Sequence, residues 1–189
     1  DDPKLRRFRY GVQVNSLGLT EAQPENNVQR IVLEALGVTL SKRARARSIQ
    51  LPAWNEALGL PKPWDQQWSL RIQQVLALET DLLEHDDIFD GSHVIEGRTA
   101  ELVHEAEAEL AEVIELGGAF AAIGELKSRL VASNTERVRQ IEAGELTVVG
   151  VNAFEETAQS PLGGDGSFLK VDPRVESEMI DDVASWRSC

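Results

Sequence analysis

The first 80 residues alternate between extended and helical patterns, and this alternation restricts the fold more than any other feature. Residues 8–15 predict a strand, because large apolar side chains alternate there with polar residues or glycine. Residues 28–36 predict a helix with one apolar face. A second strand at 48–51 and a second helix capped by Asp65 repeat the order. The alternation indicates βα units and a parallel sheet.

The pattern changes after residue 85. Residues 86–91 are rich in turn-forming residues, with room for one further strand. A long amphipathic helix is predicted over about 100–116, and a second helical stretch runs on to Gly144. Gly117 and Gly118 separate the two, because consecutive glycines end a helix. The second half therefore adds helices that a simple βα repeat does not explain.

Residues 146–189 are predicted to be mainly extended. Residues 146–151 predict a short apolar strand. From about residue 159, Gly, Ser, Asp and Pro dominate, which predicts an extended tail or linker. We therefore divide the chain into one main domain, residues 1–158, and a tail, residues 159–189.

Composition excludes several classes of protein. No stretch approaches about 18 uninterrupted apolar residues, so no membrane-spanning segment is predicted, and the start lacks the apolar core of a secretory signal. Residues 74–189 carry 8 Lys and Arg against 25 Asp and Glu, which argues against a nucleic-acid partner. The single cysteine, Cys189, excludes an intrachain disulfide and favours a reducing, cytoplasmic setting.

The segment 48–61 is the main candidate for a site. It begins as a strand, breaks at Pro52, and then presents Trp54, Asn55 and Glu56. A loop that carries an indole, an amide and a carboxylate suits one wall of a ligand site. The alternative is a strand-to-helix connection in which Trp54 packs and Glu56 is solvated. Residue types alone favour the alternative.

Further polar residues lie where the predicted strands end. Gln13 and Asn15 end the first strand, and Gln50 ends the second. Because the carboxyl ends of parallel strands meet at one edge of a sheet, these groups are expected near the loop that carries Glu56. The alternative is that the two glutamines face solvent between helices.

Other features give weaker signals. The basic run 42–47 could hold the phosphates of a nucleotide-like ligand, but a solvated turn is the more ordinary interpretation. The histidines, His85, His93 and His104, lack metal-ligand spacing, so no metal site is predicted. No Gly-rich phosphate loop, Gly-x-Ser-x-Gly or Cys-x-x-Cys motif occurs.

Four segments, in this order, resemble motifs of the adenosylcobalamin-dependent acyl-CoA mutases, the methylmalonyl-CoA mutase family. Residues 10–27 resemble a family strand and its Leu-Thr…Asn-Asn loop. Residues 55–61, Asn-Glu-Ala-Leu-Gly-Leu-Pro, resemble the family segment Asp/Asn-Glu-Ala-Leu-Gly-Leu-Pro. Residues 89–96 and 148–154 are similar to Trp-x-Gly-Ser-Tyr-Tyr-x-Glu and Val-Val-Gly-Val-Asn-x-Phe/Tyr. The first hundred residues are most similar to the ethylmalonyl-CoA mutase branch, with the isobutyryl-CoA mutases as near neighbours.

The resemblance implies an α/β fold that is the C-terminal part of a (β/α)8 TIM barrel with additional helices, incomplete on its own. A complete barrel needs eight strands and typically about 250 residues. The family's Asp-x-His-x-x-Gly cobalamin motif has no counterpart here. The implied partners are therefore an acyl-CoA substrate, a complementary barrel half and a cobalamin-binding domain or subunit, in a homo- or hetero-oligomer. Adenosylcobalamin would be bound mainly outside this chain.

The resemblance also implies roles for individual residues on the cofactor side. Glu56 matches the glutamate that contacts the ribose hydroxyls of the adenosyl group, and Ala57 and Leu60 match residues that line the adenine pocket. A family glutamine aligns with Ala22, so the neighbouring Gln23 is the candidate for that contact. Asn55 completes the cofactor-binding candidates.

On the substrate side, Ser48 matches a serine that helps to bind the coenzyme A moiety. We group Gln13, Asn15 and Gln50 with it as substrate-binding candidates. The implied activity is a radical carbon-skeleton rearrangement of the ethylmalonyl-CoA/methylsuccinyl-CoA, isobutyryl-CoA or methylmalonyl-CoA type. No catalytic residue is identified. The rival hypothesis is a non-catalytic assembly subunit or remnant of such a mutase, and a generic α/β binding module fits four ordered motifs poorly.

Overall fold

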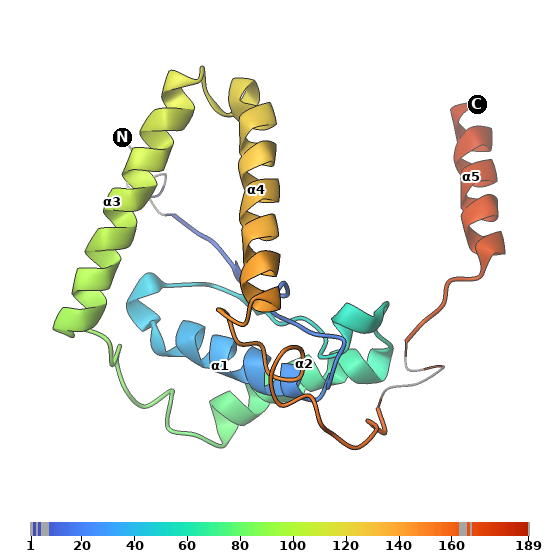
Figure 1. The fold of residues 1–189 in the computed structure, drawn as a ribbon, viewed down its shortest axis with the longest axis horizontal. Helices are drawn as coiled ribbons and strands as arrows, with labels where there is room; N and C mark the ends of the chain where they lie inside the picture. The colour runs from blue at the N-terminus through green and yellow to red at the C-terminus, as the bar shows by residue number, and fades with distance from the viewer. Residues whose placement is uncertain (1, 3, 5–7, 163–165, 167, 189) are drawn as a thin grey trace. The chain divides into compact units, whose positions relative to one another are not determined.

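The chain folds into two compact units, which we describe separately. The computed structural model describes residues 2, 4, 8–162, 166 and 168–188 (Figure 1). Unit 1 comprises the described parts of residues 1–38, 46–82 and 159–189, and unit 2 comprises residues 39–45 and 83–158.

Unit 1 is built on one β-α-β connection. Strand β1 (Val12–Gln13) pairs in parallel with β2 (Ile49–Gln50), and helix α1 (Asn26–Leu40) connects them. Val12 lies opposite Ile49, and Gln13 lies opposite Gln50. The predicted parallel pairing is confirmed, although both strands are shorter than the alternating patterns that predicted them.

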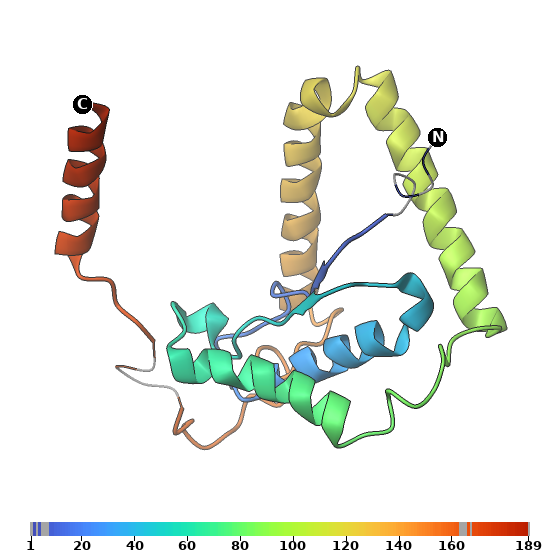
Figure 2. The same ribbon diagram turned by 180° about the vertical axis from the view of Figure 1, so that it is seen from behind.

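One face of this strand pair is covered by α1 and α2 (Pro63–Leu78), as Figures 1 and 2 show from opposite sides. The core between them is apolar and contains five buried residues: Val14, Ile31, Ala35, Leu51 and Trp54. Partly buried side chains surround them, among them Val28 from α1 and Ile72 and Leu76 from α2. The apolar face predicted over residues 28–36 is therefore the face of α1 that packs, whereas α2 packs through Ile72 and Leu76 and leaves Trp68 and Val75 exposed.

Helix α2 begins earlier than predicted. Asp65 is not the residue before the helix but lies in its first turn, where it is 2% exposed. Its carboxylate accepts a hydrogen bond from the backbone N–H of Lys62 at 2.8 Å. Pro63 starts the helix because proline lacks the N–H that a first helical residue leaves unused.

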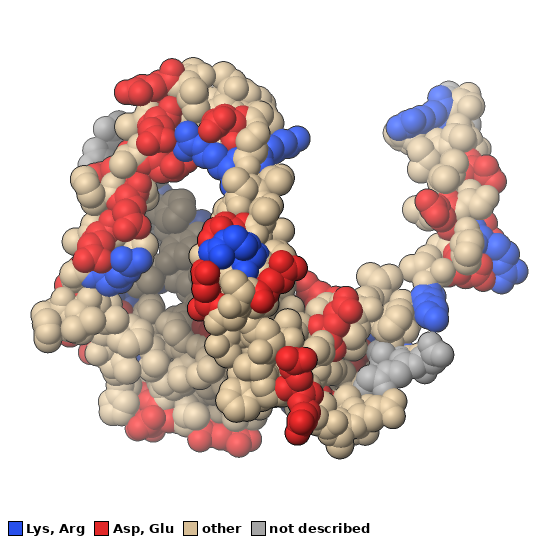
Figure 3. Space-filling model, in the orientation of Figure 1, with Lys and Arg blue, Asp and Glu red and all other residues tan. Residues whose placement is uncertain are grey.

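Unit 2 is mainly a pair of long helices, α3 (His93–Glu115) and α4 (Ala119–Glu142), which contact each other. The predicted glycines form the turn, with φ of 94° at Gly117 and 88° at Gly118. Arg129 on α4 reaches Glu109 and Glu112 on α3 at 3.0 Å each. Carboxylates line α3 in the space-filling view (Figure 3), in keeping with the acidic second half of the sequence.

The strand predicted at 146–151 is wrong, because these residues form turns with one isolated bridge between Val149 and Ala153. The side chain of Asn152 explains the turn: its Oδ1 accepts from Val148 N, and its Nδ2 donates to Ile141 O and Leu146 O, all at 2.7 Å. Residues 86–91 likewise form turns and contain no strand.

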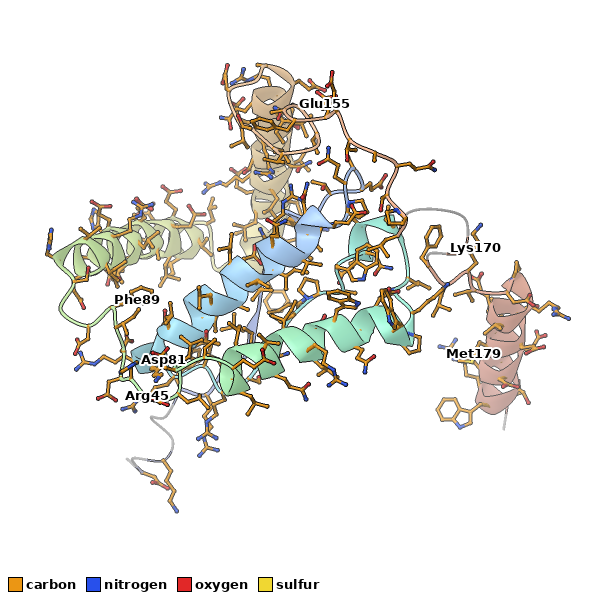
Figure 4. All side chains as sticks on the ribbon, turned by 90° about the horizontal axis from the view of Figure 1, so that it is seen from below. Arg45, Asp81, Phe89, Glu155, Lys170 and Met179 are labelled. Carbon is orange, nitrogen blue, oxygen red and sulfur yellow. The ribbon has the colours of Figure 1, made fainter. Side chains whose placement is uncertain are left out.

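The segment 159–189 ends in helix α5 (Pro173–Arg187), whose start is capped by the Asp172 carboxylate. Met179 lies on this helix (Figure 4), together with other exposed apolar side chains. The prediction of an extended tail is therefore wrong for residues 173–187, because Asp172 and Pro173 start a helix there. The boundary that we drew at residue 159 stays a prediction. In the described part of the chain, no helix is both long and apolar enough to cross a lipid bilayer.

Candidate functional site

The strand pair of unit 1 has one apolar face and one polar face. Side chains alternate along a strand, so Val14 and Leu51 point into the core while Gln13 and Gln50 lie on the opposite face. Both glutamines are exposed and are direct partners in the parallel register. The structure therefore brings together two residues that sequence reasoning assigned to substrate binding.

Gly11 and Ser48 continue the polar face toward the start of the strands. A Cβ atom built on Gly11 would lie 2.4 Å from Ser48 Oγ, closer than real Cβ atoms approach any atom. The backbone N–H of Val12 donates to Ser48 O at 2.9 Å, which fixes this neighbourhood. The exposed Ser48 hydroxyl thus lies on the same face as the two glutamines.

The loop after β2 is buried and held by hydrogen bonds up to Glu56. Residues 51–55 are all buried, and Glu56 is the first exposed residue after them. Ser69 Oγ on α2 donates to Pro52 O at 2.9 Å, and Asn27 Nδ2 on α1 donates to Trp54 O at 2.9 Å. Glu56 then opens a single 3-10 turn, Glu56–Leu58. Its carboxylate is consequently presented to solvent from a fixed loop.

The other residues of this loop differ in accessibility. Leu60 is exposed and Ala57 is half-buried, so both can contact a ligand next to Glu56. Asn55 is fully buried, and its carbonyl accepts from Leu58 N at 2.9 Å. The turn ends at Gly59, where φ is 148° and a Cβ would lie 2.8 Å from the Phe168 ring.

The loop after β1 carries Gln23 in a left-handed conformation, with φ of 48°. Such a backbone is uncommon for a residue other than glycine and often marks a functional position. Its Oε1 accepts from Asn26 Nδ2 at 3.0 Å, and Thr20 Oγ1 donates to Ala22 O at 2.8 Å. Asn15 is exposed, whereas Gln23 is half-buried, and Asn15 Oδ1 accepts from Leu17 N at 2.9 Å at the start of the same loop.

The basic run 42–47 directly precedes Ser48, and its residues 42–45 belong to unit 2. Arg43 donates to Asp87 Oδ2 through its backbone N–H at 2.8 Å and reaches Asp90 Oδ1 at 2.5 Å through its guanidinium. The donation from Arg43, followed by that from Phe89 N, lowers the pKa of Asp87. Arg45, labelled in Figure 4, has a φ of 57° and helps to line the adjoining cleft of about 380 Å³.

This cleft does not suit phosphate. It is lined by three basic residues and three aspartates, namely Lys42, Arg43, Arg45, Asp86, Asp87 and Asp90. The aspartates cancel the positive field that an anion needs. The solvated turn is therefore the interpretation that fits the basic run.

Metal-binding groups are not assembled in the part of the chain that the structure describes. His85, His93 and His104 are all exposed. No group of three or more His, Cys, Asp and Glu among the described residues is arranged to hold a metal ion.

Sequence reasoning missed the residues that hold the loops. Asn27 and Ser69 are buried polar residues, and each bonds a carbonyl of the loop before Glu56. The missed signal is periodicity: Asn27, Ile31 and Ala35 share the buried face of α1 at four-residue spacing. A polar residue on an apolar face indicates a specific hydrogen-bonding task.

The amino-acid sequence of the chain matches those of known proteins. A family model described as methylmalonyl-CoA mutase matches residues 1–189. The chain is 62% identical over 190 residues to an ethylmalonyl-CoA mutase of Methylorubrum extorquens, covering 99% of this chain and 28% of that protein. It is 59% identical over 189 residues to an ethylmalonyl-CoA mutase of Cereibacter sphaeroides, covering 100% of this chain and 29% of that protein.

A more distant relative is a methylmalonyl-CoA mutase of Escherichia coli, 33% identical over 156 residues, with 82% of this chain and 21% of that protein covered. The chain thus spans little more than a quarter of the length of the two ethylmalonyl-CoA mutases.

Proposed function

We infer, because this chain belongs to the methylmalonyl-CoA mutase family, that it is part of an adenosylcobalamin-dependent acyl-CoA mutase. The observation that carries the proposal is the exposed Glu56 carboxylate on a loop that is buried and hydrogen-bonded up to that residue. Such a fixed carboxylate, at the carboxyl end of a parallel strand, suits recognition of a ligand bearing paired hydroxyls.

The reaction that we propose is a carbon-skeleton rearrangement of an acyl-CoA ester. The identities of 62% and 59% to ethylmalonyl-CoA mutases favour the ethylmalonyl-CoA/methylsuccinyl-CoA type over the methylmalonyl-CoA and isobutyryl-CoA types. Adenosylcobalamin, when bound, supplies the radical chemistry. The residues of this chain bind and orient the reactants and exclude water from them.

On the cofactor side, Glu56 would accept hydrogen bonds from the ribose hydroxyls of the adenosyl group. The chemistry of the donor set fits, because a carboxylate offers two acceptor oxygens and apolar Ala57 and Leu60 adjoin it for the adenine. Gln23 would add an amide contact from the neighbouring loop. Asn55 is buried, so it would contribute mainly by shaping the loop. Glu56 would position the cofactor and take no part in acid–base catalysis.

On the substrate side, the polar face of the strand pair would hold the coenzyme A arm. Barrel interiors are usually filled by bulky branched residues. Here that face carries Ser48, Gln13 and Gln50, and at Gly11 no side chain projects from it. This small and hydrogen-bonding surface suits a slender polar ligand better than a packed core, with Asn15 at its upper edge.

We further propose that unit 1 is the closing part of a (β/α)8 barrel. A two-stranded parallel sheet has two open edges, and sheets of this kind are rarely left so. The missing strands and the cobalamin-binding domain would come from the rest of a longer chain or from partner subunits. The cytoplasmic setting and the domain division at residue 158 stay predictions.

The second candidate is a non-catalytic assembly subunit or remnant of a mutase. Native mass spectrometry of the gently purified protein with adenosylcobalamin, followed by an isomerase assay, separates the two. Companion segments with bound cofactor and turnover of ethylmalonyl-CoA support the enzyme. A species that assembles but binds neither adenosylcobalamin nor acyl-CoA supports the second candidate.

A further inference from the structure

We propose that Asn27 is a positioning residue that sets the distance between the loop carrying Gln23 and the loop carrying Glu56. The inference rests on the proposed cofactor role of those two residues. Asn27 itself is 0% exposed, so it cannot touch a ligand. Its effect would pass through the backbone segments that it joins.

The carboxamide of Asn27 uses its full hydrogen-bonding capacity. Nδ2 donates to Thr20 O at 2.8 Å and to Trp54 O at 2.9 Å. Oδ1 accepts from Thr20 N at 3.0 Å and from Arg30 Nη1 at 2.7 Å. A carboxamide has two N–H donors and two acceptor positions, so all four are occupied.

These bonds connect the two loops directly. Thr20 stands three residues before Gln23, and Trp54 stands two residues before Glu56. One rigid side-chain group therefore joins points that lie next to both proposed cofactor contacts. The loop before Glu56 has a second anchor, because Ser69 Oγ donates to Pro52 O.

Asparagine is the residue type that this position requires. Two carbonyls face Nδ2 while an N–H and a guanidinium face Oδ1, so donors and acceptor must stand side by side. An aspartate of the same shape would place an oxygen against both carbonyls. An apolar residue would leave buried backbone groups without partners, which is costly.

The test uses the full-length mutase that contains this segment, with Asn27→Asp as the main variant. Asn152→Asp is the matched control, because Asn152 Nδ2 also bonds two carbonyls and its Oδ1 also bonds one backbone N–H, but in unit 2. Three quantities are measured: adenosylcobalamin Kd, KM for the acyl-CoA, and amide hydrogen exchange of the cofactor-free protein over residues 20–24 and 54–58. Asn27→Ser replaces Asn27→Asp if the latter does not fold.

Asn27→Asp is expected to raise the adenosylcobalamin Kd about tenfold or more, because small misplacements of positioning groups are costly. Exchange over both loops should accelerate, and KM for the acyl-CoA should change much less. In a Glu56→Ala background the effect of Asn27→Asp on Kd should shrink to about twofold, since coupled residues are not additive. Asn152→Asp should lower the melting temperature without changing Kd.

Two results would overturn the inference: a folded Asn27→Asp protein with native Kd, or an effect of equal size with and without Glu56. If Glu56→Ala alone leaves Kd unchanged, the proposed cofactor role of Glu56 fails instead. The exchange measurement then still decides whether Asn27 holds the two loops.

Discussion

The hydroxyl of Ser48 occupies the space that any side chain at Gly11 would need. A Cβ on Gly11 would lie 2.4 Å from Ser48 Oγ and 3.5 Å from Ser48 O. The two residues adjoin across the paired strands, on the face that also carries Gln13 and Gln50. The glycine is therefore explained by its neighbour, and not by backbone conformation.

Gly11→Ala should destabilise unit 1 and disturb the proposed coenzyme A contact. The added methyl must displace the Ser48 hydroxyl, which can rotate about one side-chain bond, so the cost should lie at the low end of the roughly 1–3 kcal/mol that overpacking causes. Urea unfolding should show the loss, and KM for the acyl-CoA should rise in the assembled enzyme. Gly37→Ala is the control, because a Cβ at this position of helix α1 meets nothing within 4 Å. This variant should raise the free energy of unfolding by roughly 0.5–1 kcal/mol. Unchanged stability and KM in Gly11→Ala would contradict the close contact.

Glu56→Ala should weaken adenosylcobalamin binding and lower turnover in the assembled enzyme while leaving the fold intact. The side chain is exposed, so surface truncation should change the free energy of unfolding by no more than about 0.5 kcal/mol. Cofactor titration and steady-state kinetics measure the first effect, and thermal unfolding measures the second. Glu21→Ala, an exposed glutamate in the other loop, is the control. Unchanged kinetics and cofactor affinity in Glu56→Ala would contradict the proposed role of Glu56 in cofactor binding.

Gln23→Gly should separate stability from function. Glycine removes a left-handed strain of roughly 1–2 kcal/mol, while the lost bond from Asn26 Nδ2 offsets about 0.5–1.5 kcal/mol of that gain. The free energy of unfolding should therefore stay nearly the same or rise. Cofactor affinity should nevertheless fall if the Gln23 amide makes the proposed contact. Equal affinity in a stable variant would remove Gln23 from the cofactor site.

Arg139→Gln should raise the pKa values of Glu136 and Glu145. The Arg139 guanidinium bonds both carboxylates, with N–O distances between 2.8 and 3.0 Å, and this holds each pKa below its ordinary 4.5. Because the folded-state pKa values are lowered, their stabilisation is present above pH 4.5 and is lost as the pH falls through the lowered values.

Carboxyl NMR titration measures the change directly. Both midpoints should move up toward 4.5 in Arg139→Gln, and the acid-unfolding curve of the variant should depend less on pH below that value. Arg137→Gln is the control, because Arg137 makes no ion pair with any described residue. Midpoints that stay low without Arg139 would show another cause for the shifts.

Short stretches of sequence were enough to predict the strand pair, the apolar face of α1 and the turn between α3 and α4. The alternation around Val12 and Val14, the apolar face of α1, and the glycines at 117 and 118 all predicted features that the structure contains. The strand at 146–151 failed because apolar runs do not reveal whether a partner strand exists. There the hydrogen bonds of Asn152 close a turn instead.

The candidate site was predictable only in part, for a related reason. Gln13 and Gln50 were proposed because they end the predicted strands, and Glu56 was proposed through a motif; their roles stay predictions. The fixed geometry of the loop depends on Asn27 and Ser69, whose partners lie 27 and 17 residues away in the chain. No local window contains both members of such a pair, so only the folded chain identifies them.

The hydrogen bond from Asn27 to Trp54 also bears on how the chain folds as it is made. At ribosomal rates of about 5–20 residues per second, Trp54 is synthesised roughly one to five seconds after Asn27. Until then the Asn27 carboxamide lacks its partner at Trp54 and stays bonded to water, so α1 cannot reach its native packing against the loop. The loop and the helix must therefore lose water together in one late step.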